Sequence, residues 1–217
     1  MARKHKELKE YTNLIVMLMA IANYAKDIHY TCAGQAAYSK HLFADLLQDD
    51  IYDFIDDLKE NVYLGQQKYP ESSRVYLLAA ARMIPSIDVE DKQKFMMIAE
   101  LIDETRQLLE GIEAPTRGVG SLLDNICEHL DKCCGLLFLQ TRDDGSEEKV
   151  SEGEFKKESC KGCVEREVDR AKAEVAEIDR KKVADRVLDY EAQNLLVAEE
   201  EKEESTLDRV AGKLGLE

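Results

Sequence analysis

Apolar residues recur three and four positions apart along most of the first 140 residues, which is the period of one face of an α-helix. Five stretches show this pattern: residues 7–33, 36–63, 75–84, 86–111 and 121–140. Glycine and proline, which commonly end helices, stand between the stretches, at Gly34, Gly65, Pro85 and Pro115. The pattern therefore predicts four long helices, with a short fifth helix, 75–84, between the second and the third.

Four long helices joined mainly by short turns predict an all-α fold. We expect a four-helix bundle over residues 1–141, in which the short helix occupies the crossover. Residues 142–159 contain almost no apolar side chains, and this composition predicts a flexible linker. Residues 160–217 are expected to form a charged helical extension that ends in a short docking helix.

An apolar stripe with alternating steps of four and three runs along the expected extension, as in the seam of a coiled coil: Val164, Val168, Ala171, Val175 and Ile178. The register slips by one before Val183, which would interrupt a supercoil. Two interpretations stay open: a solvated helix held by its own ion pairs, or a helix that packs on a protein partner. Likewise, the terminal segment 205–217 either docks on a partner or folds back on its own oligomer.

The chain is strongly acidic, with a formal net charge of −15. Residues 143–217 carry 14 basic and 23 acidic side chains, so the extension is the more acidic part. An acidic surface repels phosphates and favours protein partners or cations, so a nucleic-acid partner is disfavoured. The one basic arm, residues 3–9, is offset by neighbouring glutamates.

The chain begins with a polar run and contains no apolar run of the roughly 18 residues that a membrane span needs. We therefore expect no secretory leader and no membrane anchor. Six cysteines in such a chain favour the reducing cytoplasm over a disulfide-linked secreted fold. Cys127, Cys133 and Cys134 lie in the last predicted bundle helix, where small buried side chains are expected.

Two histidines and two acids form the candidate metal ligands. His29 and His41 are twelve residues apart, and Asp56 and Glu60 follow one helical turn apart. At about 1.5 Å per residue, His41 and Asp56 on one continuous helix would lie roughly 22 Å apart, too far to bind one ion. A shared metal ion would therefore need the histidines of one subunit and the carboxylates of another. Asp45, one turn after His41, is expected to orient that histidine or to add an oxygen ligand.

Cys160 and Cys163 form a Cys-Lys-Gly-Cys motif, which raises the question of zinc or redox chemistry. No second Cys-x-x-Cys or histidine pair follows the motif, and no strand is predicted before it. Zinc at Cys160 and Cys163 is therefore disfavoured. A metal site completed by another subunit's pair or by Cys133 and Cys134, an inter-chain or transient disulfide, and an ordinary turn before a helix stay open.

Residues 23–65 resemble the Dps-like miniferritins, a branch of the ferritin-like superfamily. The resemblance rests on seven residues at the family's spacing: His29, Tyr30, Gly34, His41, Asp45, Asp56 and Glu60. Tyr30 stands where the family usually has tryptophan, and Asn61 where arginine is common. The Leu64-Gly65 pair arrives one position early, which leaves open a register that uses Asp57 and Asn61 instead.

The resemblance implies a ferritin-like bundle over roughly residues 7–141 and a ferroxidase centre between two-fold-related subunits of a homo-oligomer. On this basis His29 and His41 would bind iron through nitrogen, and Asp56 and Glu60 would neutralise charge and bridge two irons. The expected function is oxidation of ferrous iron for storage or for protection against oxidants. The alternative is a non-enzymatic assembly subunit, for example of a virion, that uses the bundle as scaffold and the extension to clamp its partners.

Overall fold

The computed structural model describes residues 2–34, 36–141 and 162–182, with side chains from residue 8 onward. These residues form helices and connecting turns, so the protein is all-α as expected. Residues 162–182 are helical. Within residues 2–141 the elements, in chain order, are α1 (Ala2–Thr31), α2 (Ala37–Gln48), α3 (Ile51–Leu58), the π-helical turn η1 (Lys59–Tyr63), the 3-10 turn η2 (Leu64–Gln66), α4 (Ser73–Met83), α5 (Asp91–Glu110) and α6 (Arg117–Thr141).

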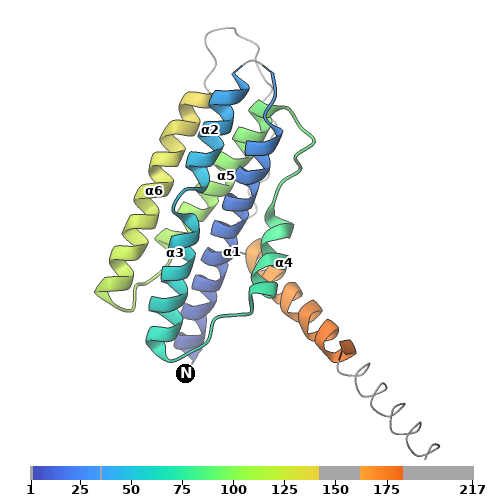
Figure 1. Cartoon of the computed structure of the whole chain (residues 1–217). Helices are drawn as coiled ribbons and strands as arrows, with labels where there is room; N and C mark the ends of the chain where they lie inside the picture. The colour runs from blue at the N-terminus through green and yellow to red at the C-terminus, as the bar shows by residue number, and fades with distance from the viewer. Residues whose placement is uncertain (1, 35, 142–161, 183–217) are drawn as a thin grey trace, which may run out of the picture. The chain divides into compact units, whose positions relative to one another are not determined.

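Helix α1 is the centre of the fold. Every residue from Glu10 to Ala22 is buried, because α2, α3, α4 and α5 all pack against this helix. From Leu14 to Ala22 its sequence is apolar on all sides, which is the pattern of a helix buried all round and not of one with a solvent face. Figure 1 shows α1, the α2–α3 pair, α5 and α6 running side by side, with α4 against α1.

The prediction of one continuous helix over residues 36–63 is wrong. Helix α2 ends at Gln48 and α3 begins at Ile51, and between them Asp50 adopts a left-handed conformation with φ of 58°. Aspartate tolerates this conformation better than most residues, and its side chain competes with helical hydrogen bonding.

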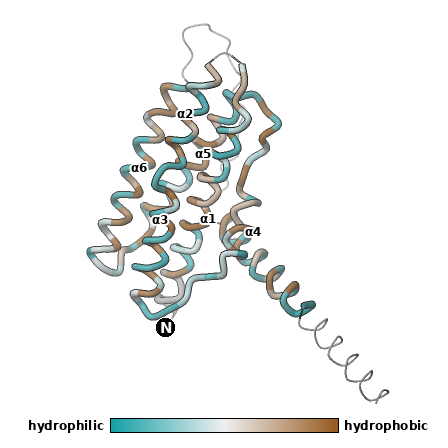
Figure 2. The backbone as a smooth tube through the Cα atoms, viewed as in Figure 1, coloured by the Kyte–Doolittle hydropathy of each residue, from teal (hydrophilic) through white to brown (hydrophobic). Residues whose placement is uncertain are grey.

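The other predicted helices are present with shifted ends. Helix α4 matches the predicted short helix closely. Helix α5 begins at Asp91, after the extended residue Glu90, five residues later than the predicted stretch 86–111. Helix α6 begins four residues earlier than predicted and shows alternating hydrophobic and hydrophilic turns in Figure 2, as expected for a helix with one face in the core.

The first part of the extension belongs to the same compact unit as the helices before it. The chain divides into two units, Met1–Lys172 and Ala173–Glu217. Within the first unit the stripe residues Val164, Val168 and Ala171 are buried. Acidic residues beside the stripe form ion pairs with α1 and with α4. Glu165 and Asp169 pair with Lys9 of α1, and Glu167 pairs with Arg82 of α4.

The apolar stripe was expected either to lie on a solvated helix or to pack on a protein partner. Its first three positions instead pack within their own chain. The predicted linker 142–159, the slipped register from Val183 onward and the docking helix 205–217 lie outside the described residues, so the domain division stays a prediction. In the part of the chain that the structure describes, no helix is both long enough and apolar enough to cross a membrane.

Candidate metal centre

His41, in the second turn of α2, faces the end of α1. Its ring Nδ1 lies 3.0 Å from the backbone carbonyl oxygen of His29. A carbonyl oxygen can only accept, so Nδ1 carries the proton and donates it. In the neutral ring, the Nε2 lone pair of His41 is therefore available for a ligand, which is the tautomer that a metal-binding histidine with such a partner adopts.

His29, near the end of α1, is only 9% exposed and pairs with Asp45 of α2. Its Nδ1 lies 2.9 Å from Asp45 Oδ1, yet this nitrogen makes no directed hydrogen bond. The same carboxylate oxygen accepts from Gln48 Nε2 at 2.7 Å and lies 3.7 Å from Lys26 Nζ. The structure thus pairs Asp45 with His29 and not with His41, which it was expected either to orient or to join as an oxygen ligand.

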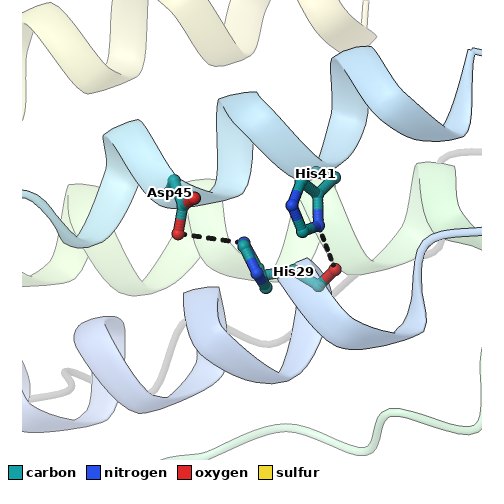
Figure 3. A group of neighbouring side chains, drawn as sticks. All are labelled: His29, His41 and Asp45. Carbon is teal, nitrogen blue, oxygen red and sulfur yellow. Dashed lines mark hydrogen bonds and ion pairs between the residues drawn. The ribbon is translucent and has the colours of Figure 1, made fainter.

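Two nitrogens and one oxygen come together at this point. Ligand atoms of His29, His41 and Asp45 all lie within 4.8 Å of one another, and Figure 3 shows the two rings and the carboxylate meeting between α1 and α2. The ring centroids of the two histidines are 3.6 Å apart. Imidazole and carboxylate together suit divalent transition metals such as Fe²⁺, Co²⁺ and Zn²⁺. The nearly buried Nδ1 of His29, without a directed hydrogen bond, fits such an ion.

Asp56 and Glu60 are not part of this cluster within the chain. Both side chains are exposed, Asp56 on α3 and Glu60 on η1. A π-helical turn rotates less per residue than an α-helical turn, so η1 turns Glu60 back toward the side of the helix that carries Asp56. Both carboxylates are thus open to solvent, one helical turn apart in sequence.

Large apolar side chains are exposed around the cluster. Tyr30 and Tyr38 are 72% and 74% exposed, and each ring lies beside a histidine: Tyr30 is 4.8 Å from the His29 ring and Tyr38 is 6.4 Å from the His41 ring. Leu42 of α2 and Tyr52 of α3 are about half exposed. Exposed apolar side chains gathered at one place are typical of a surface that another protein covers.

A network at the start of α5 holds the two histidine-bearing segments together. Asp91 Oδ2 accepts from Lys40 Nζ at 2.8 Å and from the backbone N of Ala33 at 3.2 Å, and its Oδ1 lies 3.1 Å from Lys94 Nζ. Burial by itself would raise the pKa of Asp91, but the hydrogen bonds from Lys40, Ala33 and Lys94 lower it below its usual value.

Sequence reasoning missed this network and also Lys26 and Gln48. Asp91 and Lys94 look like an ordinary exposed i,i+3 pair in the first turn of a helix. In the sequence, the one hint is that Lys94 directly precedes Phe95, an apolar residue of the core face of α5. In the structure Lys94 is only 5% exposed.

A second pair of metal-ligand types lies on α6, where Cys133 Sγ is 3.5 Å from His129 Nε2. Burial raises the pKa of the Cys133 thiol to about 11 and lowers the pKa of His129. Both groups are therefore neutral at pH 7, which is the state of a buried thiol–imidazole hydrogen bond and not of an activated thiolate. Cys133 is buried as expected, whereas Cys127 and Cys134 are partly exposed. Cys163 is a free thiol that accepts from Arg166, and Cys160 lies outside the described residues.

Comparison of the chain with protein-family models and with curated proteins finds no match.

Proposed function

We propose that this protein binds ferrous iron between two copies of the chain and oxidises it, as the resemblance to Dps-like miniferritins implies. The observation that carries the proposal is the convergence of His29 of α1 with His41 and Asp45 of α2, which brings two imidazoles and a carboxylate to one point. Helix α1, the α2–α3 pair, α5 and α6 lie side by side, and this arrangement supports a ferritin-like bundle with α4 in the crossover.

The site is proposed to be completed by Asp56 and Glu60 of a second copy. Three ligand atoms from one chain leave coordination positions for further ligands, and the exposed carboxylate pair supplies oxygen. Negative charge is also needed, because Asp45 is the one carboxylate of the cluster and Lys26 lies beside it. The exposed tyrosines around the cluster provide the apolar surface on which the second copy would pack.

In this proposal Fe²⁺ is the substrate and each ion gives up one electron. Two Fe²⁺ reduce one hydrogen peroxide, which takes up two protons and leaves as two waters; with dioxygen as oxidant, four Fe²⁺ and four protons are needed to form two waters. Imidazole nitrogen binds Fe²⁺ well, whereas carboxylates stabilise the more highly charged Fe³⁺ product more strongly. The mixed donor set therefore lowers the free energy of the oxidised ion relative to the reduced ion. The nearly buried position of His29 limits access of water to one side of the site.

The test is peroxide consumption that depends on Fe²⁺. Purified protein is mixed with Fe²⁺ without oxygen, hydrogen peroxide is added, and formation of Fe³⁺ is followed by absorbance. His41→Ala and the pair Asp56→Ala with Glu60→Ala should each abolish the reaction above the background of free iron. His129→Ala is the matched control, because it removes an imidazole outside the cluster. Wild-type protein that neither binds nor oxidises Fe²⁺ would remove the proposal.

A second candidate is an assembly subunit, favoured by the length of chain that follows α6, residues 142–217. A segment of this length beyond the bundle is not needed for a metal site between bundles. In this case removal of residues 173–217 should change the size of the oligomer or its binding to a partner. Unchanged mass in solution together with intact iron oxidation would count against this candidate.

A further inference from the structure

Asp91 makes hydrogen bonds to both segments that lead to the metal cluster. Its Oδ2 binds the backbone N of Ala33, which follows α1, and Lys40 Nζ of α2, the residue before His41. Its Oδ1 binds Lys94 Nζ. Lys94 Nζ in turn donates to the backbone oxygen of Thr31 at 3.2 Å and lies 3.3 Å from the Thr31 hydroxyl, two residues after His29.

The connection that these contacts hold is conformationally demanding. Gly34 has φ of 75° and Ala36 has φ of 63°, so the chain turns from α1 into α2 through two left-handed residues. Ala36 has a Cβ, and a side chain disfavours this conformation by roughly 1 kcal/mol. The turn therefore depends on outside contacts to keep its shape, and the contacts described are those of Asp91 and Lys94.

We propose that Asp91 is a positioning residue for the metal centre, which fixes the ring tautomer of His41 by holding the end of α1 and the start of α2 in register. The inference rests on the proposed function. The relative position of the two helix ends determines whether His41 Nδ1 can donate to the carbonyl of His29, and this bond leaves Nε2 free for a metal ion. Asp91 touches neither histidine. It acts through Lys40 on the α2 side and through Ala33 and Lys94 on the α1 side.

The charge of Asp91 is essential to this role. Lys94 is nearly buried, and a buried ammonium group needs a counter-charge. Asp91 supplies that charge while Lys94 binds the carbonyl end of α1, where a positive charge is favourable. Replacing the carboxylate by an amide keeps the shape of the side chain but removes the charge that holds Lys40 and Lys94 together.

The test compares Asp91→Asn with Asp131→Asn. Asp131 of α6 pairs with Arg106 of α5, so the control removes an equally charged link between two helices, away from the cluster. Two quantities are measured in the full-length protein: Co²⁺ affinity by titration calorimetry, and the protonated ring nitrogen of His41 by long-range ¹H–¹⁵N spectra of the metal-free protein. Thermal unfolding shows that each variant is folded under the conditions used.

In Asp91→Asn we expect Co²⁺ affinity to fall about ten-fold, the low end of what loss of a supporting hydrogen-bond partner costs a metal site. We also expect His41 to populate both tautomers, whereas wild type and Asp131→Asn show Nδ1–H. If Asp91→Asn does not fold, Lys40→Met replaces it, because this change removes the α2 link and leaves Lys94 paired. Its expected loss of Co²⁺ affinity is about three-fold, with the same tautomer signature.

The outcomes separate the two proposals. Wild-type protein that binds no Co²⁺ counts against the proposed metal function, and the tautomer comparison then decides the role of Asp91 alone. A different result overturns the positioning role: wild type and Asp91→Asn bind Co²⁺ equally well, and His41 stays protonated at Nδ1 in both. That result leaves the metal site standing. Equal losses in the Asp91 and Asp131 variants would also overturn it.

Discussion

The ring Nδ1 of His41 lies 3.0 Å from the backbone carbonyl oxygen of His29. The main chain of one candidate ligand therefore orients the ring of the other, and neither can shift without disturbing the pair. This bond spans the turn between α1 and α2, so the geometry of the site depends on how that turn is held. Three of the predictions below concern the turn, its contacts and the covering of α1.

Ala36→Gly should stabilise the protein. Ala36 adopts a left-handed backbone conformation, with φ of 63°, that glycine occupies without steric cost. Relief of this strain should raise the free energy of unfolding by up to about 1 kcal/mol. The greater conformational entropy of glycine in the unfolded chain offsets part of this gain. Urea unfolding measures the change. Ala37→Gly, in the first turn of α2, is the matched control and should destabilise by up to about 1 kcal/mol. Stabilisation by both changes, or by neither, would contradict the account of the turn.

The contribution of Asp91 to stability should be lost in acid. Its pKa in the folded protein is below the unfolded value of 3.8, so the ionised form favours folding. The contribution is fully present above pH 3.8 and disappears as the pH falls through the lower, folded pKa. The difference in melting temperature between wild type and Asp91→Asn should therefore be constant near neutral pH and shrink below about pH 4. A difference that grows as the pH falls would mean that the carboxylate is not ionised in the fold.

Val168→Asp should destabilise the first unit strongly. Val168 is fully buried in the helical segment that pairs with α1 and α4, so an aspartate there places a charge without a partner in the core. The expected loss is about 3 kcal/mol or more in the free energy of unfolding, measured by urea. Val175→Asp is the control, because Val175 is partly exposed, and should cost about 0.5 kcal/mol. Similar small losses in both variants would show that residues 162–172 do not cover the core.

The positions of the helices could be predicted because apolar periodicity directly reports which face is buried. Tyr11, Leu14 and Leu18 of α1 are buried, as their spacing indicated. The burial of α1 on all sides was not predicted, although the unbroken apolar run from Leu14 to Ala22 indicates it; the run does not show which segments cover each side. Val164 and Val168 pack within the same unit although more than 130 residues separate them from the end of α1.

The candidate site was predictable in its residue types but not in its contacts. His29, His41 and Asp45 were named from sequence, and they meet. The partner of Asp45 was not predictable, because one turn of separation on α2 suggested His41 whereas the packing of α2 on α1 brings it to His29. Asp91 carries no local signal at all, since its role arises from contacts with residues 51 and 58 positions away.

The most direct test of the shared metal site mixes two inactive variants. His41→Ala lacks a nitrogen ligand, and the Asp56→Ala, Glu60→Ala variant lacks the carboxylate pair. In a mixed dimer, one site would combine intact histidines from one copy with intact carboxylates from the other, and the second site would lack both. After the two variants are unfolded together and refolded, the account predicts that Fe²⁺ oxidation returns to a substantial fraction of wild type, while each variant refolded alone stays inactive. A refolded mixture that contains mixed oligomers but oxidises no more Fe²⁺ than the separate variants would contradict a site shared between two copies.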